Sequence, residues 1–183
     1  MPTYREWENN ELPYGFLITF RTYGTWLHGD DRGSVDRHNN IYGSPRIPGS
    51  RRRKAYHRSL MKSEPVSLDA KRRAAVHDAI VEVCRHRGWT LHAINVRTNH
   101  VHVVVSTTHR NHSIVINAFK AYATRKMREQ GCWPSDHSPW VDKGSQRVLW
   151  NAKSLEGACE YVIHGQGADL DNFDEWLSKR PND

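Results

Sequence analysis

Long apolar stretches are missing from this sequence, and their absence argues against a membrane-spanning protein. No apolar run approaches the roughly 20 residues that a transmembrane helix needs. The first segment, MPTYREWENNELPYG, is polar and acidic where a signal peptide has an apolar stretch. With 37% hydrophobic and 26% charged residues, the composition is typical of a soluble globular protein. We therefore expect a cytoplasmic protein without a membrane partner.

Paired cysteines are also missing. The chain has only Cys84, Cys132 and Cys159, which are odd in number and far apart, with no CxxC pair. This usage argues against a disulfide framework and against a structural zinc site. We expect all three thiols to be reduced.

Acidic residues are absent from residues 45–63, PRIPGSRRRKAYHRSLMKS, which contain seven Lys or Arg. The whole chain has a formal net charge of +7, and the commonest partner of a basic protein is a phosphate backbone. Tyr56 and His57 lie within this run, where their rings are able to stack on bases. The alternative is an ordinary solvated loop. The run predicts DNA contacts by four neighbouring cations, Arg51, Arg52, Arg53 and Lys54.

The spacing of apolar residues predicts an α+β fold with a single domain over residues 1–183. Alternating or β-branched runs predict strands, and runs with one apolar face that end at glycine predict helices. The order matches a ferredoxin-like antiparallel sheet with helices on one face. Residues from about 28 to 63 would form a basic insertion loop, and those from about 151 to 183 a C-terminal helical extension. The predicted strands are 15–27, 91–98, 100–107 and 147–150, and the predicted helices are 63–89, 112–131 and 154–165.

A histidine pair, His100 and His102, begins the strand predicted at 100–107. Side chains two residues apart on a strand point to the same face, so the two imidazoles stand side by side. Val101 between them points to the opposite face, toward the core. Two neighbouring imidazoles are suitable ligands for a divalent cation if a third group completes the site. The alternative is a pair of solvent-facing histidines on an amphipathic strand.

Tyr122 lies among cations in the segment FKAYATRKMR of the helix predicted at 112–131. A phenol is a poor nucleophile unless cations or a metal stabilise the phenolate. Tyr122 is therefore a candidate nucleophile for a DNA phosphodiester, and the alternative is a core aromatic on the apolar side of the helix. The neighbouring cations that we expect to contact DNA are Lys120, Arg125 and Lys126.

These segments together resemble the single-tyrosine HUH transposases, particularly the REP-associated tyrosine transposases. The resemblance covers about residues 14–166 and is carried by LITFRTYGTWLHGD, TNHVHVVVS, FKAYATRKMR and WVDKGSQRVLWNAKSLEGACEYVIHG. It implies a Mg²⁺ or Mn²⁺ ion held by His100 and His102, and attack by Tyr122 on a single-stranded DNA phosphate. It also implies a 5′-phosphotyrosine intermediate with a free 3′-OH, and rejoining without ATP.

The third metal ligand departs from the pattern of that family. Some relatives have an amide or a carboxylate one helical turn after the tyrosine, whereas this chain has Lys126, which has no acceptor atom. The third ligand is left open, with His28, Glu129 and Gln130 as candidates.

Three functions follow from these patterns. The first is a nuclease and strand transferase that acts on single-stranded or hairpin DNA. The second is a nucleic-acid-binding module of the same fold that has lost its chemistry, although the sequence lacks the RNP1 pattern of RNA-binding sheets. The third, a hydrolase of small phosphoesters, does not explain the basic charge. The resemblance is compatible with a monomer or a homodimer.

Overall fold

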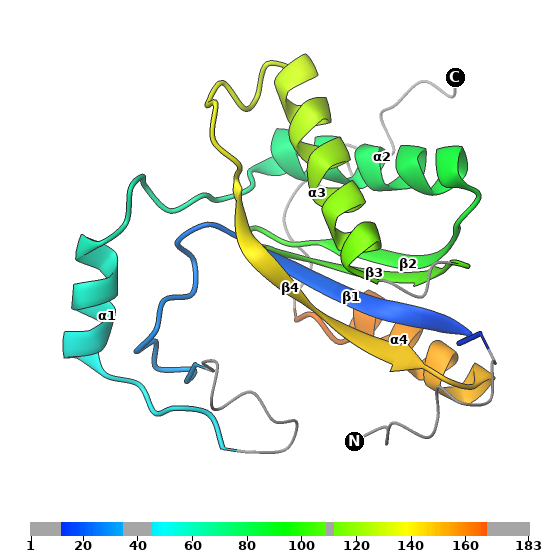
Figure 1. The fold of residues 1–183 in the computed structure, drawn as a ribbon, viewed down its shortest axis with the longest axis horizontal. Coiled ribbons are helices and arrows are strands. Elements are labelled where there is room, and N and C mark those ends of the chain that lie inside the picture. The colour runs from blue at the N-terminus through cyan, green and yellow to red at the C-terminus, as the bar shows by residue number, and fades with distance from the viewer. Residues whose placement is uncertain (1–11, 35–44, 109–111, 168–183) are drawn as a thin grey trace. The chain divides into compact units, whose positions relative to one another are not determined.

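The computed structural model describes residues 12–34, 45–108 and 112–167 (Figure 1). Its contacts divide the chain into two compact units. Among the described residues, one unit comprises 23–66, and the other comprises 12–22 with the residues from 67 onward. The basic insertion predicted at about 28–63 therefore falls within the first unit. The end of the predicted C-terminal extension, residues 168–183, lies outside the described residues.

A four-stranded sheet forms the centre of the larger unit. Its spatial order is β2-β3-β1-β4, and each neighbouring pair is antiparallel. This order is the one that a strand–helix–strand–strand–helix–strand chain produces in a ferredoxin-like fold, which confirms the predicted fold class. The strands are β1 (Gly15–Thr22), β2 (Thr90–Val96), β3 (His100–Ser106) and β4 (Trp140–Leu149).

Helices α2 (Ala70–Arg87) and α3 (His112–Glu129) cover one face of this sheet (Figure 1). Helix α2 begins at Asp69, whose side chain accepts a hydrogen bond from the Arg72 amide and satisfies a backbone donor of the first turn. It ends at Gly88, which adopts φ +66°, a conformation that glycine reaches without strain. The alternate residues of β1 and β3 that point toward these helices are fully buried: Phe16, Ile18, Phe20, Val101, Val103 and Val105.

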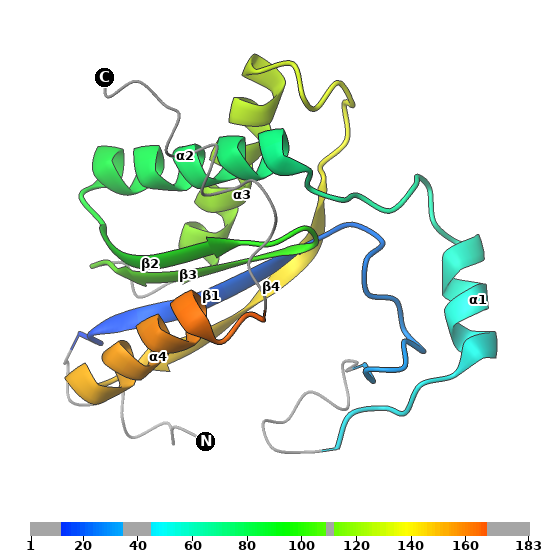
Figure 2. The same ribbon diagram turned by 180° about the vertical axis from the view of Figure 1, so that it is seen from behind.

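Helix α4 (Ala152–His164) covers the opposite face of the sheet, as Figures 1 and 2 both show. Its buried residues Ala158 and Val162 pack into a small cluster with Ala93, Val104 and Leu149. Asn95 on β2 also donates to the carbonyl of Val162 at 3.0 Å, which ties the end of α4 to the sheet. The C-terminal extension thus gives the sheet a second covered face, which the sequence prediction had not assigned.

The smaller unit contains a helix, α1 (Arg51–Ser59), in the segment that the sequence predicts as a loop. Its N-cap is Ser50, whose side chain accepts from the Arg53 amide. None of the helical residues is buried, so hydrophobic periodicity does not reveal the helix. Polar contacts hold it instead: the Lys54 ammonium lies 3.1 Å from the buried carboxylate of Asp30, which Arg32 also contacts.

Candidate active site

The histidine pair occupies the face of the sheet that α4 covers. His100 and His102 alternate with the buried valines of β3, and their ring centroids are 4.7 Å apart. His102 pairs with Thr19 of β1 and Asn95 of β2, and Asn95 is the residue that bonds to α4. The expectation that the two imidazoles share one face of the sheet is therefore met.

Polar partners fix the orientation of both rings. The Asn99 side-chain oxygen only accepts hydrogen bonds, so His100 Nδ1 is the donor in their 2.6 Å contact. In the neutral imidazole the lone pair of His100 is then on Nε2, which is the usual arrangement in a metal-binding histidine. The Thr19 hydroxyl lies 2.7 Å from His102 Nδ1 and is able to donate or accept.

His102 is 7% exposed, and this burial changes its protonation. Burial, followed by the positive charge of His100, lowers the pKa of His102 to about 4. The imidazole is therefore neutral at pH 7 and has a lone pair to offer to a cation.

Tyr161 of α4 is the tyrosine that lies beside the pair. Its ring centroid is 5.7 Å from that of His102, in an edge-on arrangement with an interplanar angle of 76°. The residue is 47% exposed, although its neighbours Ala158 and Val162 are buried against the sheet. The helix thus holds a phenol at the histidine pair while leaving it open to a large substrate.

Gln166 joins Tyr161 to the histidines. Its side-chain Nε2 donates to the Tyr161 carbonyl at 3.1 Å, and its amide also hydrogen-bonds to His102. Within the described residues no group of three or more His, Cys, Asp or Glu side chains is able to hold a metal ion. An amide oxygen is a suitable metal ligand, and the Gln166 side chain lies within hydrogen-bonding distance of His102.

The third-ligand candidates from the sequence lie elsewhere. Glu129 ends α3, on the other side of the sheet, and its carboxylate lies 3.5 Å from the Arg125 guanidinium. Gln130 directly follows that helix. His28 belongs to the smaller unit, where its ring lies 5.0 Å from that of His57.

Tyr122 does not lie with the histidines, although the resemblance implies that it attacks a phosphate at a metal ion held by them. It is on α3, which covers the face of the sheet toward which Val101 points. Its ring is partly buried, 6.5 Å from the ring of His86 on α2, with the Arg125 guanidinium carbon 4.3 Å from its centre. Because the sheet separates α3 from the pair, the surroundings of Tyr122 match the alternative, a packing aromatic.

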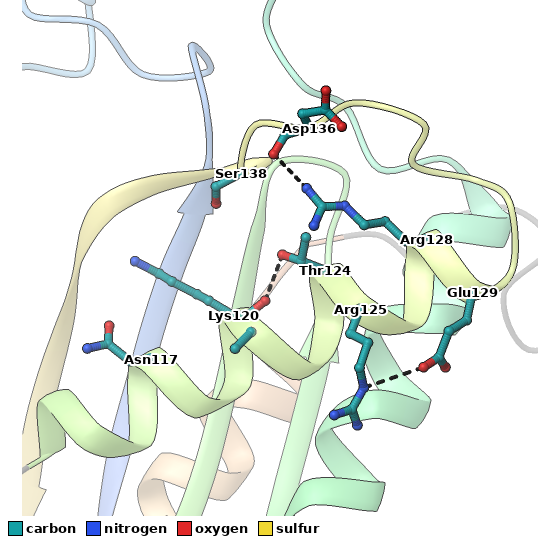
Figure 3. Close-up of a pocket in the computed structure, with 9 residues that line it drawn as sticks. Asn117, Lys120, Thr124, Arg125, Arg128, Glu129, Asp136 and Ser138 are labelled. Atoms are coloured by element: carbon teal, nitrogen blue, oxygen red, sulfur yellow. Dashed lines mark hydrogen bonds and ion pairs between the residues drawn. The ribbon is translucent and has the colours of Figure 1, made fainter.

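Lys120 is likewise unsuited to the DNA contact that the sequence predicts. It is 8% exposed, and its ammonium donates to the carbonyls of Val141, Asp142 and Lys143 at 2.7, 3.0 and 3.2 Å. Burial lowers the pKa of Lys120. Figure 3 shows its side chain extending away from α3, with the Thr124 hydroxyl bonded to its carbonyl at 2.8 Å. This lysine holds the start of β4 to α3.

Arg125 and Lys126 join α3 to α2. The Lys126 ammonium lies 2.7 Å from the carboxylate of Glu82, and the Arg125 guanidinium lies 3.4 Å from the same group. Arg125 also contacts Glu129, one turn along α3 (Figure 3). Both cations thus neutralise carboxylates on the α2 and α3 side of the sheet.

The four cations predicted in the insertion are all on α1. Arg51, Arg52 and Arg53 are exposed, whereas Lys54 is partly buried and paired with Asp30. Lys54 is therefore engaged within its own unit. That the three arginines contact DNA stays a prediction.

Sequence reasoning missed Tyr161 and Gln166. Tyr161 lies near the end of the last segment that carries the family resemblance, and Gln166 directly follows that segment. The pattern that points to Tyr161 is strand alternation. If Val101 faces the helices of the core, the histidines face away from those helices. Tyr161 is on the remaining predicted helix, 154–165, and is therefore the better candidate.

Comparison with known families gives one match. The family model described as "Transposase IS200 like" matches residues 54–152, more than half of the chain. The matched segment contains His100, His102 and Tyr122 and ends before Tyr161. No curated protein matches the chain.

Two solved structures are similar to this chain at low identity. One is a REP-associated tyrosine transposase bound to a REP hairpin, with 12% identity and a TM-score of 0.44 over 82% of this chain. The chain spans 65% of the length of that protein. The other, a candidate transposase from Deinococcus radiodurans R1, has 13% identity and a TM-score of 0.40, covering 87% of this chain and 95% of the other.

Proposed function

Because this chain belongs to the IS200-like transposase family, we propose that it cuts and rejoins single-stranded DNA, with Tyr161 as its nucleophile. One observation carries this assignment: the Tyr161 ring lies 5.7 Å from that of His102, on the face of the sheet that holds the histidine pair. Tyr122, which the sequence favoured, is on the opposite side of the sheet. We therefore replace it with Tyr161 as the proposed nucleophile.

The histidine pair and Gln166 fit a divalent cation such as Mg²⁺ or Mn²⁺. The His100 tautomer leaves a lone pair on Nε2, His102 is neutral at pH 7, and Gln166 offers an amide oxygen. When bound, the ion would supply Lewis-acid polarisation of the phosphate under attack. Asn99 and Thr19 would keep the two rings oriented.

The proposed reaction is a transesterification of one phosphodiester bond. The Tyr161 oxygen forms a bond to phosphorus as the bond from phosphorus to the 3′ oxygen breaks. The phenol loses one proton, and the departing oxygen takes up one proton to become a free 3′-OH. The product is a 5′-phosphotyrosine, and attack by a 3′-OH on this ester regenerates the tyrosine and joins the strands. One phosphodiester replaces another, so no ATP is consumed.

We propose single-stranded DNA, including strands with hairpins, as the substrate. The formal net charge of +7 and the exposed Arg51, Arg52 and Arg53 support a polyanionic partner. Either a monomer or a homodimer is compatible with one complete site in each chain.

The test compares Tyr161→Phe with Tyr122→Phe. Each variant removes one phenol oxygen, and the two tyrosines are on opposite sides of the sheet. Labelled hairpin-bearing single strands are incubated with protein and Mg²⁺ or Mn²⁺, and denaturing gels measure the covalent adduct. Tyr161→Phe removes the attacking oxygen, so the adduct should disappear while DNA affinity remains. Tyr122→Phe should form the adduct at the rate of the parent.

The opposite result, in which Tyr122→Phe loses the adduct and Tyr161→Phe keeps it, would return the nucleophile to α3. If neither the parent nor any variant forms an adduct although each binds DNA, the chain is a binding module that lacks the chemistry.

A further inference from the structure

A cleft of about 590 Å³ opens beside Tyr161, between α4 and the strands β1 and β4. It is continuous with the proposed active site, since Tyr161 is one of the residues that line it. The strands contribute Leu17 and Arg147, and α4 contributes Lys153, Ser154, Gly157 and Ala158 in addition to Tyr161.

The charge of this cleft is entirely positive. Arg147 and Lys153 are both exposed, no acidic residue lines the cleft, and neither cation forms an ion pair with any described residue. The cations of α3 differ, because Arg125 and Lys126 share the carboxylate of Glu82. Arg147 pairs across the sheet with Leu17, two residues from Thr19, which contacts His102. The Arg147 guanidinium, which no described residue neutralises, thus lies one step along the sheet from the histidine site.

The side of the cleft that α4 forms has no side chain at Gly157. Gly157 lies four residues before Tyr161, which places both on the same side of the helix. A Cβ atom at Gly157 would meet nothing within 4 Å, so packing against the protein does not require glycine there. Glycine inside a helix is less favourable than alanine, so this position does not serve helix stability. The helix rises about 12 Å from Lys153 to Tyr161, so the cleft extends along α4 over this length to the proposed nucleophile.

We infer that this cleft binds the backbone of the DNA strand next to the phosphate that Tyr161 attacks. Arg147 and Lys153 bind its phosphates, and the missing side chain at Gly157 leaves space for the strand to reach the phenol. These side chains bind phosphates and not base edges, so they position the strand without recognising its sequence. The inference rests on the proposed function, because it takes Tyr161 as the site of attack.

The experiment measures equilibrium binding of a fluorescent single-stranded oligonucleotide in the Tyr161→Phe protein, where no covalent capture occurs. Arg147→Gln with Lys153→Gln removes both cations from the cleft. The matched control, Lys71→Gln with Arg85→Gln, removes the same charge from exposed positions on α2, across the sheet.

We expect the cleft pair to weaken binding at least tenfold and to flatten the slope of log affinity against log salt by about 1.4, since each phosphate contact contributes about 0.7 on a single strand. The control pair should change affinity less than threefold and leave the slope unchanged. Equal losses in the two double variants would overturn the inference, because they would reflect net charge alone.

Gly157 provides an independent test that does not alter charge. The Cβ of Gly157→Leu meets no protein atom within 4 Å, the rest of the side chain extends into the cleft, and leucine improves helix propensity, so the melting temperature should hold or rise. DNA affinity should fall at least tenfold, whereas Gly157→Ala should cause a much smaller loss. Parental affinity in a folded Gly157→Leu protein would show that the strand does not lie in the cleft.

The experiments can refute the proposed nucleophile and the proposed role of the cleft separately. An adduct that persists in Tyr161→Phe refutes the proposed nucleophile, while the binding measurements still report on the cleft. Unchanged binding in the cleft variants, with an adduct that depends on Tyr161, refutes only the cleft.

Discussion

The two faces of the sheet are built from the same strands but have different properties. On the face toward α2 and α3, β3 contributes Val101, Val103 and Val105, all fully buried. On the face toward α4, the same strand contributes His100 and His102 beside a half-exposed tyrosine. Along β3 the first face is apolar throughout, whereas the second combines the two histidines with Val104, which packs against α4. Alternation along one strand thus places the candidate site and the main core on opposite faces of the sheet.

The cations differ between the faces in the same way. On α3, Lys120 donates to three carbonyls, and Lys126 pairs with Glu82. On the α4 face, Arg147 and Lys153 form no ion pair with a described residue. A count of basic residues along a helix therefore does not by itself indicate a DNA site. A more informative property is whether other described residues already neutralise those charges.

The largest expected effect comes from the α4 face. His100→Ala or His102→Ala should slow cleavage about 10³-fold or more, since loss of a Lewis acid removes several kcal/mol of transition-state stabilisation. Adduct formation should recover in part at high Mg²⁺ or Mn²⁺, because mass action drives an ion onto a weakened site. Circular dichroism should show an unchanged fold. Cleavage at the parental rate by both variants would refute the metal site.

An intermediate effect should come from Lys120 on the other face. Lys120→Met keeps the length of the side chain but leaves three carbonyls of β4 without their donor, which should destabilise the protein by roughly 1–3 kcal/mol. Urea unfolding measures this loss. At temperatures where the variant is folded, its affinity for DNA should equal that of the parent. A loss of affinity without a loss of stability would instead make Lys120 a DNA contact.

The smallest effect should come from Glu82, which joins α2 to α3. The Lys126 ammonium, 2.7 Å away, holds the pKa of Glu82 below its usual value, although partial burial opposes this shift. A lowered pKa contributes stability above the unfolded pKa of about 4.3, and this contribution is lost as the pH falls below that value. The side chain is 44% exposed, so solvent limits the contribution to about 1 kcal/mol or less.

Glu82→Gln should therefore lower the free energy of unfolding slightly at pH 7, and the difference from the parent should shrink as the pH falls below 4. Thermal unfolding at pH 7, 5 and 3 measures this change. A difference that grows toward acid would contradict the assigned role of the pair.

Much of the fold follows from the sequence because strand alternation and helical periodicity are local properties. The order of strands, the helix that ends at Gly88 and the shared face of His100 and His102 all depend on such patterns. The position of Tyr122 follows from the same pattern once Val101 is placed against the helices. The cations around Tyr122 suggested an activated phenol, but their charges serve packing between helices.

Other features depend on contacts that no local pattern contains. Helix α1 has no buried residue, so its presence rests on the Ser50 cap and the ion pair between Lys54 and Asp30. Gln166 follows the end of α4, and its role depends on the approach of that helix to His102. To predict either feature from the sequence, one must know which distant segments of the chain contact each other.

Helix α4 also sets the order in which the site can be assembled during synthesis. The sheet and both core helices are complete by Leu149, whereas Tyr161 comes from the last described helix. Helix α2 buries eight residues, but α4 buries only Ala158 and Val162, so α4 is the more weakly anchored element. With Tyr161 as the proposed nucleophile, a nascent chain has its histidine pair before it has the attacking phenol. We therefore expect such a chain to be unable to cleave DNA until α4 has docked.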